Sequence, residues 1–445
     1  MNKLIRWGII GVTTFILASC NLRLYSKVPE TTQYKDTEAQ FAFLKSALQN
    51  GAAEEMQTVF PEGYFFTHVL YGLSWVNVGL AENLDPAVRE QALFEARQAY
   101  ARLSEPAGKA PFPANQTPPH GIFYLGWRNY LLSGILLLQQ PSPLNQRELR
   151  EFQANCEAIA NALRDSEPLF LPSYPQEVWP VDTFPAMLSL RGHTMLINNR
   201  YEPVIEAWLA ETKAELRQQA IPLANHRQAP FVQAPRGTSQ ALIQRFLPEL
   251  DPAWAAESYV LFRRGFVTQR LGLPGVLEYP TLAQTSPAQT GQGLAKGDVD
   301  SGPLVAGVSL SATAVALGTA KLNGDEALHS AIWQASELVG LSFIWRRGAE
   351  QKRYWFGLLP VTDAFLLWSQ TARPWFGQPV AATNQQYFWW WRWPIHGLSL
   401  ALWIGLMWGV SHRRKARKQR RAALQRRRTH DEPPSAQLSA LPQRR

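Results

Sequence analysis

Three short stretches of this 445-residue chain place a carboxylate beside aromatic or turn-forming residues, just before a segment with helical periodicity. They read PEGY at 61–64, YPQEVWPVDT at 174–183 and GDVDSGP at 297–303. The first turn of a helix has unpaired N–H groups, so an acidic side chain there serves as a cap. A carboxylate in a cleft serves instead as a general acid or base. We therefore expect the three junctions to line one acidic, aromatic cleft, with plain helix capping as the alternative.

The third stretch contains the preferred catalytic residue. Asp298 and Asp300 are two residues apart, so in extended backbone both carboxylates point the same way. Crowded carboxylates raise one another's pKa, which suits a general acid. We expect Asp300 to act as acid or base and Asp298 to bind substrate, with a capping turn as the alternative. Too few further oxygen ligands lie nearby for a Ca²⁺ site, and no metal is predicted.

Two further carboxylates are predicted to act with Asp300. Asp182 follows Tyr174 and Trp179, whose flat rings could hold a sugar while the acid binds its hydroxyls or transfers a proton. Glu62 precedes a helix-like segment in the same way. The alternatives are an N-cap role for Asp182 and a first-turn acid, favoured by the helix dipole, for Glu62.

The remaining predicted substrate-binding residues are aromatic or basic. Tyr64 follows Glu62 directly, and His68 lies one helical turn further on. Trp127 is predicted to extend the aromatic platform. Arg236, at a Gly-Thr-Ser turn, is predicted to grip a carboxylate or phosphate, with a structural salt bridge as the alternative.

Helices are predicted to position these residues. Apolar residues recur at three- and four-residue spacing in about twelve segments. The segments are 41–48, 66–80, 87–103, 122–138, 149–163, 183–196, 203–216, 237–247, 252–271, 305–322, 326–341 and 361–369. No convincing run of alternating strand residues is present, so we predict one all-α domain over 38–375, with a long loop at 281–296.

This number and order of helices resembles the α/α toroid, in which about six helical hairpins alternate between an inner and an outer ring. The resemblance covers about 35–375. It also includes Glu62-Gly63 followed by Tyr71-Gly72, which resembles the general-acid segment of some inverting glycosidases of that fold, with a different spacing. Members include glycoside hydrolases, polysaccharide lyases, sugar epimerases and terpenoid-acting dehydratases, and most of these classes act on carbohydrate. The resemblance implies a carbohydrate substrate for this chain.

The N-terminal residues 1–20 have the pattern of an export signal. Lys3 and Arg6 precede an apolar stretch at 7–17, which ends in Leu-Ala-Ser-Cys20. These last four residues resemble the lipobox of bacterial lipoproteins, which implies cleavage before Cys20 and lipid attachment to its sulfur. An uncleaved anchor helix is the alternative. Residues 21–37 are polar and are predicted to be a tether.

The C-terminal part has a membrane-protein pattern. An aromatic linker at 376–394 precedes a stretch at 395–412 without Asp, Glu, Lys or Arg, which predicts a transmembrane helix. Residues 413–445 contain 12 Lys and Arg against Asp431 and Glu432, a net charge of +10, whereas the whole chain carries +9. The positive-inside rule predicts a cytoplasmic tail and an extracytoplasmic, periplasmic domain held at the inner membrane.

Charge and motifs narrow the classes of function. The basic balance belongs to the tail, where contact with membrane lipid is expected and nucleic-acid binding is not. No Gly-x-Ser-x-Gly elbow, P-loop or dinucleotide fingerprint occurs, so no nucleotide cofactor is predicted. We expect a hydrolase, lyase or epimerase acting on a cell-envelope glycan. The alternative is a non-catalytic scaffold or glycan-binding accessory of an envelope complex, with a membrane protein as partner.

Overall fold

The computed structural model describes residues 3–28, 34–165, 169–219, 226–228, 231–270, 272–280, 302, 304–345, 350–377, 380 and 390–430. The chain forms two compact units. The larger is Arg23–Trp391, and the smaller combines Met1–Leu22 with Arg392–Arg445. The predicted catalytic loop around Asp298 and Asp300 lies outside the described residues, as does the predicted loop at 281–296.

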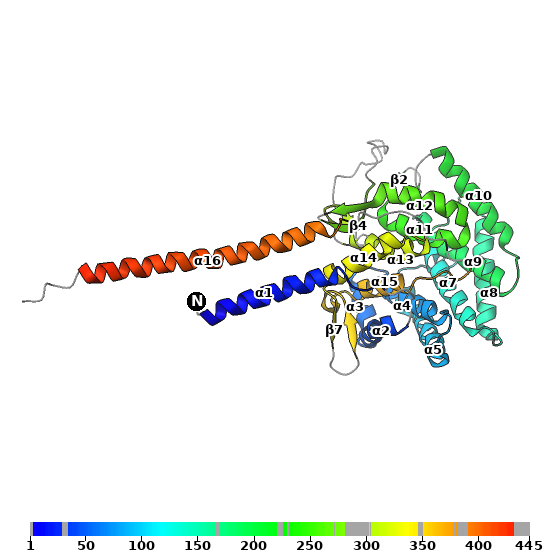
Figure 1. Ribbon diagram of the computed structural model, residues 1–445. Helices are drawn as coiled ribbons and strands as arrows, with labels where there is room; N and C mark the ends of the chain where they lie inside the picture. The colour runs from blue at the N-terminus through cyan, green and yellow to red at the C-terminus, as the bar shows by residue number, and fades with distance from the viewer. Residues whose placement is uncertain are drawn as a thin grey trace, which may run out of the picture. The chain divides into compact units, whose positions relative to one another are not determined.

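The larger unit is built mainly from α-helices, which confirms the all-α prediction (Figure 1). Its helices are α2 (Tyr34–Gln49), α3 (Ala52–Val59), α4 (Gly63–Gly79), α5 (Pro86–Leu103), α6 (Pro106–Lys109), α7 (Gly121–Gln139), α8 (Gln146–Arg164), α9 (Thr183–Leu196), α10 (Glu202–Gln219), α11 (Gly237–Leu250), α12 (Pro252–Phe266), α13 (Leu310–Leu322), α14 (Glu326–Val339) and α15 (Pro360–Gln370). Two short 3₁₀ helices are η1 (Pro180–Asp182) and η2 (Trp355–Gly357). Each of the twelve predicted helical segments overlaps one of these α-helices.

Six helices are buried on nearly every side: α4, α7, α9, α11, α13 and α15. Each packs on the next one in this order, and α15 packs on α4, so the contacts form a closed ring. The sequences explain the burial, because α7 and α13 carry apolar or small residues around their whole circumference. A helix that is apolar all round is stable only when other elements cover every face.

The other long helices cover the ring from outside. α5, α8, α10, α12 and α14 each follow a ring helix along the chain and pack on it. α8 shows the pattern, since Phe152, Cys156 and Ile159 are buried at spacings of four and three while its other faces are polar. Because each outer helix returns the chain, the ring helices run in the same direction and share one end for their N-termini.

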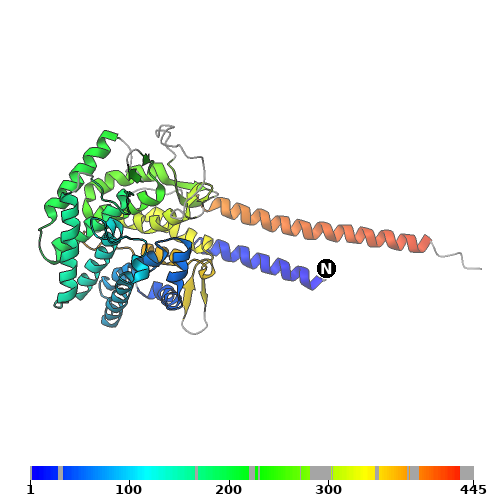
Figure 2. The same cartoon turned by 180° about the vertical axis from the view of Figure 1, so that it is seen from behind.

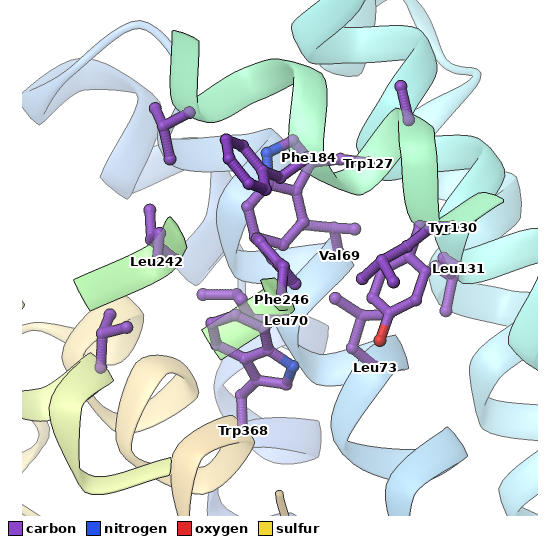
Figure 3. Close-up of a cluster of buried hydrophobic side chains, with 14 of the residues drawn as sticks. Val69, Leu70, Leu73, Trp127, Tyr130, Leu131, Phe184, Leu242, Phe246 and Trp368 are labelled. Atoms are coloured by element: carbon purple, nitrogen blue, oxygen red, sulfur yellow. The ribbon is translucent and has the colours of Figure 1, made fainter. Parts of the chain in front are cut away.

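Aromatic side chains fill the interior of the ring (Figure 3). Trp127 of α7 lies edge-on to Phe246 of α11 and to Trp368 of α15, with ring centroids 5.4 and 5.7 Å away. The guanidinium of Arg245 lies 3.5 Å from the centroid of the Trp368 ring. Burial lowers the pKa of Arg245 to about 9. The three ring helices are therefore joined by one aromatic cluster.

Short strands appear where the sequence predicted helix or loop. They are β1 (His226–Gln228), β2 (Phe231–Gln233), β3 (Val267–Arg270), β4 (Leu273–Leu277), β5 (Leu304–Val305), β6 (Val308–Ser309), β7 (Phe343–Trp345) and β8 (Gln351–Arg353). β3, β4, β6 and β5 form an antiparallel sheet in that order. The predicted helices 252–271 and 305–322 were therefore too long. α12 ends at Phe266, and α13 begins only after Ser309, whose hydroxyl accepts the N–H of Ala312.

The smaller unit contains two long helices, α1 (Lys3–Arg23) and α16 (Trp393–His430), which lie side by side in both views (Figures 1 and 2). The Asn21 amide donates to Ser399 Oγ at 2.9 Å, and Trp403 Nε1 donates to Thr14 Oγ1 at 3.2 Å. The residue order in these two contacts is opposite along the two helices, so α1 and α16 are antiparallel. α1 continues without a break through Cys20.

The described residues include no helix that is both long and apolar enough to cross a membrane. The transmembrane helix predicted at 395–412 is therefore not supported. The segment 395–412 contains no Asp, Glu, Lys or Arg. His396, Ser399 and several glycines nevertheless lower its mean hydropathy.

Candidate functional site

The shared end of the ring, where its helices begin, gathers several of the predicted residues. Glu62, Asp182 and Arg236 are the N-cap residues of α4, α9 and α11. Neighbouring ring helices are in contact at this end. For example, the N–H of Ile122 at the start of α7 donates to the carbonyl of Pro172, which precedes α9. We use the term N-terminal face for this end of the ring.

Glu62 and Tyr174 meet on the N-terminal face although they are 112 residues apart in sequence. The Tyr174 hydroxyl donates to Glu62 Oε1 at 2.6 Å, which fixes the orientation of the carboxylate. The Tyr174 ring stacks on Phe112 at 5.7 Å, and Phe112 stacks on Phe123 at 5.2 Å. The Glu62 side chain makes no capping hydrogen bond to α4, but its position at the start of α4 agrees with the helix-dipole alternative.

Tyr64 and His68 form part of the same region but are buried. The Tyr64 hydroxyl donates to Glu105 Oε2 at 2.8 Å. The pKa of Tyr64 is raised well above its usual value, mainly by burial and in second place by this hydrogen bond to a carboxylate. The His68 ring lies 4.7 Å from the Tyr64 ring. Burial, assisted by the nearby Arg102, lowers the pKa of His68 to about 4. His68 is therefore a neutral imidazole near pH 7.

Asp182 ends η1 and is buried at the start of α9, with a half-buried Trp179 three residues before it. Its side chain makes no capping hydrogen bond to α9. η1 also packs on α7 and α11, so Asp182 belongs to the N-terminal face between three ring helices. Helix capping therefore does not explain this carboxylate either.

Arg236 forms a buried ion pair that sequence reasoning missed. Its Nε lies 2.6 Å from Oε1 of Glu278, and the hydroxyl of Thr238 donates to the other Glu278 oxygen at 2.8 Å. The side chain of Arg236 is 10% exposed and that of Glu278 is fully buried. The salt-bridge alternative describes Arg236. The only signal for Glu278 in the sequence is an acid placed directly after the apolar residues 273–277.

Three predicted residues lie elsewhere. Trp127 is 1% exposed inside the ring, so its indole is not available as a sugar platform on the surface. Asp298 and Asp300, the preferred acid and its neighbour, lie outside the described residues. Cys20 is half-buried within α1 of the smaller unit.

A cavity of about 750 Å³ lies at the starts of α13 and α15, and sequence reasoning gave no indication of it. The end of α3, the β3–β4 hairpin and α14 complete its walls. The described lining is apolar apart from a few hydroxyls and Arg270, and it includes none of the predicted site residues that the structure describes. Its side chains come from elements far apart in sequence, which is why no local motif signals it.

The wall of this cavity is held by a buried polar network. The hydroxyl of Tyr354 donates to Glu337 at 2.7 Å and accepts from Gln370 at 2.8 Å. The pKa of Glu337 is lowered overall. Burial alone would raise this pKa, but the charge of Lys352 and three hydrogen bonds together outweigh the effect of burial. The neighbouring Asp363 accepts the N–H of Tyr354, and its burial raises its pKa to about 8. Tyr354 is therefore fixed at both ends.

Comparison with known proteins gives no relative, because no protein-family model and no curated protein matches the chain.

Proposed function

We propose that the larger unit is an α/α toroid whose N-terminal face acts on a glycan of the cell envelope. The observation that carries this proposal is that Glu62 and Asp182 each stand at the start of a ring helix, with Tyr174 bonded to Glu62 and Trp179 three residues before Asp182. Neither carboxylate makes a capping hydrogen bond, and Glu62 lies beside the stacked rings of Tyr174 and Phe112. Flat rings next to a carboxylate suit a sugar ring and its hydroxyls.

The proposal predicts that Glu62→Gln lowers the turnover of an envelope glycan by about a hundredfold, because loss of a general acid or base costs at least that much. The measurement is release of reducing or unsaturated sugar ends from purified envelope glycans by the full chain. Glu90→Gln is the matched control, since Glu90 is exposed on α5. Equal turnover by the Glu62→Gln variant and the parent protein would remove Glu62 from the proposal.

A non-catalytic accessory that binds glycan is the second candidate. The stacked rings of Tyr174 and Phe112 favour it, because flat aromatic faces bind sugar rings whether or not a proton is transferred. In this case the full chain retains glycan in a pull-down and releases no sugar ends. A non-catalytic protein of this kind could also serve as a scaffold within an envelope complex, with a membrane protein as its partner.

We further propose that α1 and α16 hold the chain at the cytoplasmic membrane, with the larger unit outside the cytoplasm. Both helices expose large apolar side chains, namely Trp7, Ile9, Val12, Phe15, Ile16 and Leu22 on α1, and Trp393, Leu398, Leu400, Leu402, Trp403, Ile404 and Trp408 on α16. In water such surfaces are unfavourable, at about 25 cal/mol per Å². The antiparallel pair brings the basic residues 3 and 6 and the run from 413 to the same end, which suits anionic headgroups.

Replacing both Leu402 and Ile404 by lysine is expected to release the full chain from membranes, because these two exposed apolar side chains then become charged and are costly to bury in lipid. The measurement is the distribution between membrane pellet and supernatant after alkaline carbonate extraction. Leu358→Lys is the control, since Leu358 is 74% exposed on the larger unit. Retention of the double variant in the pellet would contradict anchoring by α16.

Lipid attachment at Cys20 stays a prediction. Cleavage before Cys20 would remove most of α1, whereas an uncleaved chain keeps the α1–α16 contacts through Thr14. The mass of the protein purified from membranes decides between the two forms.

A further inference from the structure

The cavity beside α13 and α15 has the chemistry of a site for an alkyl chain. Its walls contain Leu273, Ala314, Ile332, Ala335 and Phe365, which come from the four elements β4, α13, α14 and α15. A volume of about 750 Å³ is within the range of ligand pockets, roughly 300–1,000 Å³. Each methylene moved from water into such surroundings gains about 0.8 kcal/mol.

Three hydroxyl groups of the described lining, those of Thr313, Ser336 and Tyr354, are already engaged within the protein. Thr313 Oγ1 donates to the Ser309 carbonyl at 2.7 Å and accepts the N–H of Val276 at 3.0 Å. Ser336 Oγ donates to the Trp333 carbonyl at 2.7 Å. The Tyr354 hydroxyl bonds to Glu337 and Gln370, as described above. A sugar or nucleotide inside the cavity would bury polar groups with few partners, which is costly.

One charged residue, Arg270, is present among the described lining residues. It is the last residue of β3 and pairs with Leu273 of β4 across a tight hairpin. Gly272 adopts a φ of +82° in this hairpin, a conformation that favours glycine. Arg270 is exposed, so its guanidinium is at the solvent side of an apolar cavity. An arginine in that position complements a carboxylate.

We propose that this cavity binds a single-chain anionic amphiphile of the fatty-acid class, with the alkyl chain inside and the carboxylate at Arg270. The proposal concerns a site separate from Glu62 and Asp182, and it holds whether or not the N-terminal face acts on glycan. It assigns a lipid ligand to the larger unit itself, in addition to any lipid around α1 and α16.

The test is photocrosslinking of the full chain in its membranes with a palmitic acid analogue that carries a diazirine and an alkyne. Labelled peptides from α13, α14 and α15 are expected, and excess unlabelled palmitate should remove the label. Arg270→Glu should lower labelling of these peptides about fivefold or more, from loss of a charge-assisted hydrogen bond. Arg264→Glu is the matched control, because Arg264 is exposed on α12 and does not line the cavity.

Two cavity-filling variants complete the design. Ser311→Trp and Thr362→Trp place a large ring at half-buried lining positions and should also reduce labelling. Circular dichroism establishes that each variant is folded. The Arg270→Glu variant replaces an exposed residue, so its test does not depend on repacking of the protein interior. Labelling confined to α1 and α16 would overturn the proposal while leaving the membrane anchor intact. Equal labelling of the parent and the Arg270→Glu variant would also overturn it.

Discussion

Replacing Trp127 by alanine is expected to lower the free energy of unfolding of the larger unit by about 3–5 kcal/mol. The indole is 1% exposed and contacts aromatic rings from three other ring helices, among them Phe246 and Trp368 (Figure 3). Its removal leaves a cavity that these rigid neighbours cannot fill. The measurement is the urea midpoint of the full chain, followed by far-ultraviolet circular dichroism.

The control for this prediction is Phe94→Ala, because Phe94 is 56% exposed on α5. Its midpoint should change little, since surface substitutions usually stay within about 0.5 kcal/mol. The pair also tests the sugar-platform role that the sequence predicted for Trp127. Loss of glycan binding by Trp127→Ala without loss of stability would restore that role and contradict the packing account.

Replacing Arg236 by methionine is expected to destabilise the larger unit by about 3–5 kcal/mol, because it removes one partner of a buried ion pair. The carboxylate of Glu278 is fully buried and would lose the guanidinium 2.6 Å away. Methionine keeps much of the side-chain volume, so the change isolates the charge. Chemical unfolding at pH 7 measures the effect.

Arg200→Met provides the comparison. Arg200 pairs with Glu157 at 3.2 Å, but both side chains are more than half exposed, and such pairs contribute about 0–1 kcal/mol. A double variant, Arg236→Met with Glu278→Gln, should recover part of the lost stability, because the orphaned charge is then removed as well. Equal midpoints for the Arg236→Met and Arg200→Met variants would show that the buried pair contributes no more than an exposed one.

The sequence was sufficient for the helices because their signal is local. The periodicity in 122–138 or 149–163 depends only on neighbouring residues, and α7 and α8 coincide with these segments. The sequence pattern did not predict the strands at 267–270 and 304–309. Strands of two to four residues are too short to show an alternation of apolar and polar residues. Their stability comes from pairing within one sheet, where β3 and β6 pair with β4 and β5 pairs with β6, and periodicity does not identify these partners.

The candidate site could be predicted only in part. The acid–aromatic junctions located Glu62 and Asp182 at helix starts, since caps and turns leave a local pattern. The contact between Glu62 and Tyr174, the pairing of Arg236 with Glu278 and the apolar cavity all depend on tertiary packing. No spacing rule within a single segment contains that information.

The closure of the ring has a consequence for how the chain is made. α15 packs on α4, and Asn77 donates to Thr371 across 294 residues of sequence. Until α15 has been synthesised, the apolar flank of α4 that it covers has no partner. Contacts of such high sequence separation form slowly and leave incomplete chains prone to aggregation. A nascent chain of this protein therefore has to be kept from premature association until its last hairpin has emerged.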